Sequence, residues 1–569
     1  CLCIGGWTGP DCDVKTEPPY FDMAPKYVLQ QVMGTPVSLR GELKGVVLPR
    51  DGYVTVHVGT HFTFYSVQPD SEQLELRPPH ATVRSNKFRL ELGPENLKNY
   101  ENYDVLFRYM LPNGEYGGVQ FRTRFDFCGK KLEDYPLPPY RLEHVPSSAS
   151  VNKPTTFDII TPEPTLNDQF YVRLVGPTML LGEVTQSEPG RYHATFSASE
   201  PGTYSAKVVY LHRDSAAIST ASCPDESGEM ARFTMSMRQV PGSPFEVEVS
   251  RGEESGVCGL TTNNCTPDNL SHLPLCSWSR GHIDRGEWVR KKLCNAHRHT
   301  CDVDFFLQLE ENDRRLDDWV WLPHDCRMIR YDTELARERW ISRGMRSLVI
   351  VGNSQPRTLH WDLSELVMPF VSDPSRQHEN QLEDDGTTRI SFRWLRRGSG
   401  GAANYTYVKE TLTNIFIEEN VTSTDVVVME HSLWDIFLLC GRVQDAEELH
   451  AHLDWVGELL SRLPARVLFY SSNALRAPDV AACMPAGKSG PLLDQRVRDI
   501  NAVAAAAMKK WGIPVLDTHA ITRPRPEKCL DGLHYMQLDH IVARFQSSGN
   551  SVGVTLAQAV VNLLFNPDT

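Results

Sequence analysis

Residues 347–354 read Ser-Leu-Val-Ile-Val-Gly-Asn-Ser, and this stretch decides the fold of the second half of the chain. The apolar, β-branched run that ends at Val351 is typical of a short strand buried on both faces. The glycine after it allows a sharp turn, which presents the next side chains at the tip of the strand. Three similar runs follow, at residues 425–429, 467–471 and 513–516.

Helical patterns separate these runs, at residues 356–368, 405–419, 443–463 and 491–511. Short buried strands that alternate with helices predict a parallel sheet covered by helices on both faces. The sequence therefore predicts an α/β/α domain, to which we assign residues 276–569.

Active groups of open parallel sheets gather at the carboxyl ends of the strands. Ser354 follows one such end, and Asp531 and His534 stand three residues apart near the end of the chain. That spacing lets one loop place a carboxylate against an imidazole, which can take the proton of a serine hydroxyl. The prediction is a triad of Ser354 as nucleophile, His534 as base and Asp531 as orienting acid. The alternative is structural: Ser354 caps a helix, and Asp531 and His534 form a turn.

Four motifs occur in a fixed order: Gly286-Glu287-Trp288-Val289, Trp319–Cys326, Val351–Arg357 and Asp531–Tyr535. This order resembles the PC-esterase branch of the SGNH (GDSL-like) hydrolases. That branch includes the trichome-birefringence-like polysaccharide O-acetyltransferases and the neurexophilin/PC-esterase proteins. The resemblance covers residues 276–569 and implies an SGNH-type domain with the triad named above.

Two positions depart from the family pattern. Asn353 stands where the family usually has Asp, and the run 425–429 leads into Glu430 rather than a G-x-N-D motif. Loss of an oxyanion donor can lower a rate by ~100-fold or more. The candidates to replace that donor are Gly352 and Asn353 in the serine turn, the Ser354 N–H, and the backbone around Gly400.

Three further side chains are candidates for the cleft. Arg357 could bind the carboxylate of an acidic sugar or pair with a surface acid. Trp434 and Asp435 could line the cleft or belong to the core.

Residues 145–250 carry a second signature. Pro189-Gly190-Arg191-Tyr192 is followed by Pro201-Gly202-Thr203-Tyr204, and Gly242-Ser243-Pro244-Phe245 closes the segment. The pattern resembles a filamin-type immunoglobulin-like repeat. The resemblance implies a β-sandwich whose core holds Tyr192 and Tyr204, acting as a spacer or as an adhesive or glycan-contacting module.

The segments upstream are also β-rich. Alternating residues such as Tyr53–Val58 and an Asn113-Gly114 turn predict a β-sandwich of unknown family over residues 20–134. Residues 1–13 resemble the C-terminal half of an EGF-like module, and this resemblance implies a Cys3–Cys12 disulfide. Because the chain opens at Cys1 inside that motif, any signal or membrane anchor is expected further upstream.

Composition and charge exclude several classes. With 41% hydrophobic and 23% charged residues, the chain has the balance of a globular protein rather than a disordered one. A formal charge of -14 argues against a nucleic-acid partner, whose phosphates need a basic face. Val552–Phe565 is too short to span a membrane and is expected to form an amphipathic helix.

The 14 cysteines and four N-glycosylation sequons, at Asn264, Asn269, Asn404 and Asn420, predict the secretory pathway, either extracellular or in the Golgi lumen. Most cysteines from Cys258 to Cys529 are expected to be bridged. Cys294-x-x-His297-x-His299-x-Cys301 has zinc-ligand residue types, but in an oxidising compartment a disulfide with exposed histidines is favoured. No metal or cofactor is expected, and the acyl donor is left open.

Two functions are compatible with this sequence. The first is serine-dependent acyl-ester chemistry on glycans, with the acyl group passing to water in an esterase or to a sugar hydroxyl in a transferase. The family branch favours the transferase. The second is a catalytically weak or inactive extracellular adhesion or glycan-binding protein.

Overall fold

In the computed structural model, 22 stretches of the chain are described. They are residues 7–8, 14–15, 20–24, 31–33, 37–44, 53–60, 80–83, 87–92, 101–128, 139–163, 168–213, 235–250, 274–278, 282–290, 319–368, 379–395, 405–431, 433, 443–475, 494–529, 533–535 and 551–566. The chain divides into two compact units, residues 1–136 with 478–485, and residues 137–477 with 486–569.

The described residues of the first unit form strands and one turn, and the strands are arranged in sheets of two, three and five. The predicted hairpin is present, since Gly114 adopts a positive φ of 85° between the two longest strands. Val54, Val56, Val105 and Phe107 are buried on the five-stranded sheet. The strands are β1 (Trp7–Thr8), β2 (Val14–Lys15), β3 (Tyr20–Ala24), β4 (Gln31–Met33), β5 (Val37–Lys44), β6 (Tyr53–Thr60), β7 (His80–Val83), β8 (Lys87–Leu92), β9 (Glu101–Met110) and β10 (Tyr116–Cys128).

The second unit begins with strands that enclose an aromatic core, and all of their pairings are antiparallel except that of β12 with β19. Tyr192 and Tyr204 are both buried in it, as predicted, and the Tyr192 hydroxyl donates to Asp168 Oδ2 at 3.2 Å. The strands are β11 (Arg141–Glu143), β12 (Ser148–Ser150), β13 (Thr155–Ile160), β14 (Asp168–Val175), β15 (Thr178–Glu188), β16 (Arg191–Phe196), β17 (Gly202–Arg213), β18 (Met235–Gln239) and β19 (Phe245–Ser250).

A strand pair joins this sandwich to the rest of the unit. Strands β20 (Gly286–Arg290) and β21 (Trp319–Pro323) pair with each other, and β20 also pairs with β15. The Trp288 indole donates to the Ile521 carbonyl oxygen at 2.8 Å. A Cys276–Cys326 disulfide closes the loop that holds both strands.

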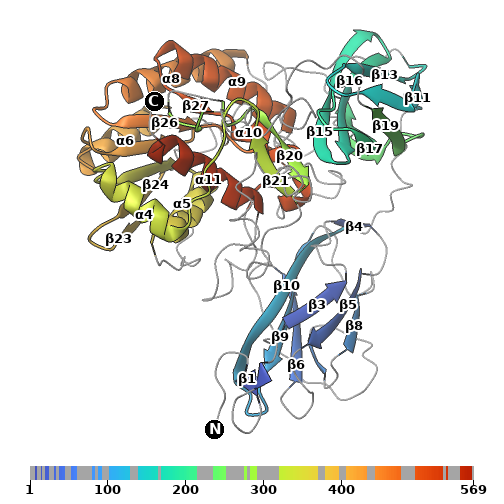
Figure 1. Cartoon of the computed structure of the whole chain (residues 1–569), viewed down its shortest axis with the longest axis horizontal. Coiled ribbons are helices and arrows are strands. Elements are labelled where there is room, and N and C mark those ends of the chain that lie inside the picture. The colour runs from blue at the N-terminus through green and yellow to red at the C-terminus, as the bar shows by residue number, and fades with distance from the viewer. Residues whose placement is uncertain are drawn as a thin grey trace. The chain divides into compact units, whose positions relative to one another are not determined.

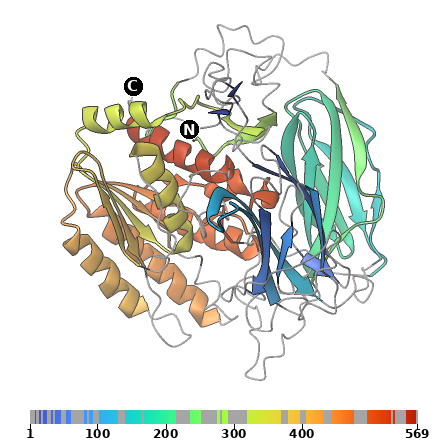
Figure 2. The same cartoon turned by 90° about the horizontal axis from the view of Figure 1, so that it is seen from below.

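The remainder is a six-stranded sheet in the order β23-β24-β22-β25-β26-β27, flanked by helices (Figures 1 and 2). All its strands are parallel except the edge strand β23. The predicted runs coincide with β22 (Leu348–Gly352), β25 (Val426–Met429), β26 (Arg466–Tyr470) and β27 (Val515–Leu516). The predicted helices coincide with α5 (Ser354–Val367), α6 (Tyr405–Glu418), α8 (Val443–Ser461) and α9 (Asp494–Lys510). The predicted terminal helix over residues 552–565 coincides with α11 (Ser551–Phe565). The elements that were not predicted are α4 (Thr333–Ser342), β23 (Gln381–Asp384), β24 (Arg389–Trp394), α10 (Thr518–Thr522) and η4 (Pro526–Lys528).

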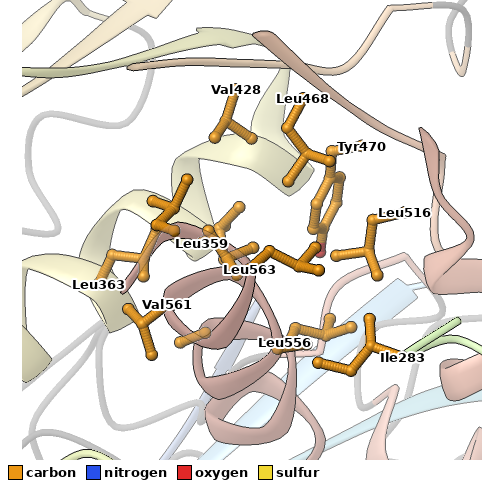
Figure 3. Close-up of a cluster of buried hydrophobic side chains, with 14 of the residues drawn as sticks. Ile283, Leu359, Leu363, Val428, Leu468, Tyr470, Leu516, Leu556, Val561 and Leu563 are labelled. Atoms are coloured by element: carbon orange, nitrogen blue, oxygen red, sulfur yellow. The ribbon is translucent and has the colours of Figure 1, made fainter. Parts of the chain in front are cut away.

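Alternate residues of each strand enter two separate cores, because successive side chains of a strand point to opposite faces. Val349, Val351 and Met429 pack with α6, α8 and α9 on one face. The other face packs against α5 and α11 (Figure 3). There the buried side chains include Leu359, Leu363, Val428, Leu468, Leu516, Leu556, Val561 and Leu563.

The prediction that Val552–Phe565 forms an amphipathic helix is wrong in one respect: α11 is buried on nearly every side. Two of its polar residues, Gln558 and Asn562, bond to the main chain of the segment before α4 instead of solvent. Gln558 bonds to both the N–H and the carbonyl of Tyr331, and Asn562 does the same for Ile329, at 2.7–2.9 Å. Among the described helices, none is long and apolar enough to cross a membrane.

Candidate active site

The turn after β22 holds the predicted nucleophile. Gly352 adopts a φ of +153°, and a Cβ there would lie 2.6 Å from the Glu430 carbonyl oxygen, so only glycine fits. Asn353 then caps α5, because its side-chain oxygen accepts from the Gln355 N–H at 2.9 Å. Ser354 is therefore fixed as the first residue of the helix.

Ser354 is buried, with 5% of its surface exposed, and its Oγ makes no hydrogen bond within the described part of the chain. Its N–H lies in the first turn of α5, where helix N–H groups have no acceptor within the helix. The partial positive charge of a helix N-terminus favours an alkoxide or oxyanion at this place. The position suits a nucleophile that awaits its substrate.

Gln355 links this turn to the predicted base. Its side-chain Nε2 donates to the Leu533 carbonyl oxygen at 3.0 Å, and its Oε1 accepts from the Asn473 N–H at 2.8 Å. His534, which follows Leu533, is 8% exposed. On its other side the Tyr535 hydroxyl donates to the Thr522 carbonyl oxygen at 3.1 Å. His534 thus lies in a segment anchored on both sides, one residue from a direct contact with α5.

Glu430, at the carboxyl end of β25, is a residue of the site that the sequence analysis did not single out as functional. It is 1% exposed. Its carboxylate accepts from the Asn353 side-chain amide, from Ser472 Oγ at 2.7 Å and from the Leu433 N–H at 3.2 Å. Burial raises the pKa of Glu430 to about 7, while these hydrogen bonds act in the opposite direction. In the sequence, Glu430 is marked only by its place, as an acidic residue directly after an apolar run typical of a buried strand.

Two of the residues predicted to bind the oxyanion or the substrate, Asn353 and Arg357, have different surroundings. The Asn353 amide donates to Glu430, so one of its two N–H bonds is already committed. Arg357 is buried at 4% exposure, with its guanidinium carbon 5.0 Å from the Trp361 ring centre and 5.9 Å from that of Trp394. It is therefore not a surface side chain.

A histidine–carboxylate pair outside the predicted triad lies near the carboxyl end of the sheet. His519 Nε2 is 2.9 Å from Asp494 Oδ1, and Arg523 Nε donates to Asp494 Oδ2 at 3.2 Å. Burial alone would raise the pKa of Asp494, but the charges of His519 and Arg523 and the His519 hydrogen bond lower it to about 2. The Leu475 N–H also binds Asp494, which joins this pair to the loop that follows β26. Sequence reasoning missed this pair because its two residues are far apart in the chain.

Two further histidines are buried together. His431 Nε2 and His452 Nε2 lie 2.6 Å apart, so one ring donates and the other accepts. Burial lowers the pKa of His431 to about 4 and that of His452 to about 2. Both rings are neutral at physiological pH.

A cavity of about 240 Å³ lies beside β27. Its apolar lining includes Ile283, Leu468, Leu516 and Leu563, all labelled in Figure 3. Ser354 and His534 do not line it. The cavity is therefore separate from the proposed nucleophile.

Several predicted residues fall outside the described stretches. They are Asp531, Gly400, Trp434, Asp435, the Cys3–Cys12 pair, the segment Cys294–Cys301, and the sequons at Asn264, Asn269 and Asn404. The fourth sequon residue, Asn420, is exposed two residues after the end of α6.

No family model matches this chain. It is 26% identical over 168 residues to the N-acetylneuraminate (7)9-O-acetyltransferase of Danio rerio. The match covers 30% of this chain and 20% of the relative, so the chain spans about a fifth of that protein's length.

Two solved structures also resemble parts of the chain. The filamin domain of Lin-41 matches 21% of this chain and 98% of its own length, at 13% identity and a TM-score of 0.15. Axe2, an acetylxylan esterase from Geobacillus stearothermophilus, matches 38% of this chain and 92% of its own length, at 12% identity and a TM-score of 0.23.

Proposed function

We propose that this chain catalyses acyl-ester chemistry on glycans in the secretory pathway, with Ser354 as the nucleophile and His534 as the base. The observation that carries the proposal is the Gln355 side chain, which bonds the segment holding His534 to the turn holding Ser354. The similarity to a sialate O-acetyltransferase supports the reaction class and a sugar ester as the substrate. The Cys276–Cys326 disulfide fits an oxidising compartment.

The proposed reaction has two steps. Ser354 Oγ attacks the carbonyl carbon of an acetyl ester while His534 takes the hydroxyl proton. The tetrahedral intermediate then collapses, and the departing sugar oxygen receives that proton from His534. In the second step water or another sugar hydroxyl attacks the acyl-serine, with His534 again moving the proton. Asp531 is the proposed partner that fixes the tautomer of His534.

Negative charge on the tetrahedral oxygen is proposed to lie at the N-terminus of α5. The Ser354 N–H and the second N–H of the Asn353 amide are the available donors in this turn. Donors fixed before the reaction stabilise the oxyanion without reorganisation. The Gly400 backbone stays a candidate third donor.

One observation favours a second candidate, a glycan-binding protein without activity. Ser354 Oγ makes no hydrogen bond to any described residue, His534 included. Catalytic hydrogen bonds are often long before substrate binds, so this arrangement is also compatible with an enzyme.

Labelling with a serine-directed fluorophosphonate separates the two candidates. The parent protein is expected to be labelled at Ser354, and Ser354→Ala is expected to show no label. Hydrolysis of a small acetyl ester should be lost in the same variant. An intact, folded parent that neither reacts with the probe nor cleaves the ester would support the binding protein.

A further inference from the structure

We infer that Glu430 is the positioning residue of the nucleophile turn, and that Asn353 and Glu430 act as one amide–carboxylate unit. The amide and the carboxylate can change places between positions 353 and 430, but two amides or two carboxylates at these positions do not fit. This inference rests on the proposed function of Ser354.

The main chains of the two residues are held together by the sheet. Strands β22 and β25 are parallel neighbours, and the Glu430 N–H donates to the Val351 carbonyl oxygen at 3.0 Å. The close approach of Gly352 to the Glu430 carbonyl leaves no room for another side chain between them. Glu430 therefore lies directly beside the turn that carries Ser354.

The carboxylate of Glu430 has a donor on each oxygen. Oε2 accepts from the Asn353 amide, and Oε1 accepts from the Ser472 hydroxyl and the Leu433 N–H. In the described part of the chain no cation forms an ion pair with Glu430. A buried carboxylate that accepts only from neutral donors is expensive to desolvate, and a purely structural role would be served as well by apolar residues. We infer that its role is to orient the groups that it binds.

Asn353 is the group through which Glu430 acts on Ser354. One end of the Asn353 side chain donates to Glu430, and the other accepts from the Gln355 N–H in the first turn of α5. The carboxylate thereby decides which end of the amide faces the helix. This fixes the cap on both sides of Ser354, which lies between residues 353 and 355.

Each single exchange breaks this arrangement. In Asn353→Asp, two carboxylates face each other in a buried place. In Glu430→Gln, the NH2 of the new amide can face either of two neighbours. It meets the NH2 of Asn353 in one orientation and the N–H of Leu433 in the other, so two donors oppose each other in both. The double variant restores every hydrogen bond, and only the bond between positions 353 and 430 runs in the opposite direction. The new amide at position 430 donates to the new carboxylate at position 353, while Ser472 and Leu433 donate to the carbonyl of that amide.

The test compares the parent with Asn353→Asp, Glu430→Gln and the double variant. Two quantities are measured at pH 8: the rate of fluorophosphonate labelling of Ser354, and the urea midpoint of unfolding. Each single variant should label ~100-fold more slowly, since a displacement of about 1 Å at a reacting group has this effect. With an acetyl ester, kcat should fall while KM stays near the parent value, because Glu430 does not touch the substrate. The double variant should regain most of the urea midpoint and should label faster than either single variant. It should stay below the parent's labelling rate, because the carboxylate at position 353 supplies no N–H to the oxyanion.

Exposed residues supply the matched controls. Asn152→Asp and Glu334→Gln make the same chemical changes on the surface and should alter neither quantity. Single variants that label like the parent, or a double variant no better than the worse single one, would overturn the inference. Failure of the proposed function looks different: the parent itself does not label. In that case the urea midpoints alone decide whether the two residues form one exchangeable unit.

Discussion

The Gln355 side chain donates to the Leu533 carbonyl oxygen at 3.0 Å, across 178 positions of sequence. Gln355 is fully buried. It follows the proposed nucleophile directly, and Leu533 directly precedes the proposed base. The geometry between nucleophile and base therefore depends on a side chain that takes no part in the chemistry.

Gln355→Ala should lower both activity and stability. The change removes the acceptor of the Asn473 N–H and one donor to the Leu533 carbonyl, and an unsatisfied buried group costs about 1–3 kcal/mol. We expect kcat for an acetyl ester to fall ~100-fold as the His534 segment shifts. Urea unfolding and steady-state kinetics measure the two effects. Gln186→Ala, on the sandwich, is the control, and equal kinetics in both variants would count against the bridge.

Variants of the proposed pair His534 and Asp531 should lose more activity than variants of the observed pair His519 and Asp494. His534→Ala is expected to fall to the residual rate of Ser354→Ala, because the members of a triad act as a unit. His519→Ala should keep most of the parent's rate. Asp531→Asn should lose up to ~10,000-fold, and Asp494→Asn much less. The reverse pattern, measured by ester hydrolysis, would make His519 the base.

The stability of the parent relative to Glu430→Gln should depend on pH. Because burial raises the pKa of Glu430 from 4.5 to about 7, the folded protein holds a proton that the unfolded chain releases in this window. The free energy of unfolding of the parent should therefore fall, relative to Glu430→Gln, by about 3 kcal/mol as the pH rises from 4.5 to 7. Urea unfolding at several pH values gives this difference.

Taking the difference between the two proteins removes the opposite effect of His431 and His452. Burial lowers the pKa values of both histidines. Their contribution to the free energy of unfolding therefore increases as the pH rises towards 6.5. A pH-independent difference between the parent and Glu430→Gln would show that Glu430 has an ordinary pKa. Glu334→Gln, on the surface of α4, should give no such dependence.

Asn562→Leu should destabilise the α/β domain although it makes a buried helix more apolar. It removes both hydrogen bonds to the Ile329 main chain, at an expected cost of about 2–4 kcal/mol in the free energy of unfolding. Thr555→Val on the same helix loses only a bond to its own helix and should cost less than about 1 kcal/mol. A neutral Asn562→Leu in urea unfolding would contradict this account of α11.

The central strands could be predicted from the sequence because β22, β25 and β26 are buried on both faces and carry unbroken apolar runs. Strand β24 could not, because Arg389 and Arg393 interrupt its pattern and pair with Glu419 on a separate element. The charges of β24 are neutralised by tertiary contacts, which a local pattern does not contain.

The candidate site was predictable only in part, for the same reason. Ser354 and His534 belong to short local motifs that a reader of the sequence can find. Glu430 and Gln355 matter through the residues they join, and those partners lie 77 and 178 positions away. Asn562 was misjudged because a polar residue on a helix indicates solvent, unless the main chain of another segment takes its place.

Helix α11 is synthesised after every other described element of its domain. Until it emerges from the ribosome, Val428, Leu468 and Leu516 lack their cover, and the N–H and carbonyl groups at positions 329 and 331 lack their partners. A premature stop codon before residue 551 would therefore do more than shorten the protein. It would leave nascent chains with only α5 of the two helices on this face of the sheet, and such partly uncovered chains are the species that chaperones retain and proteases remove.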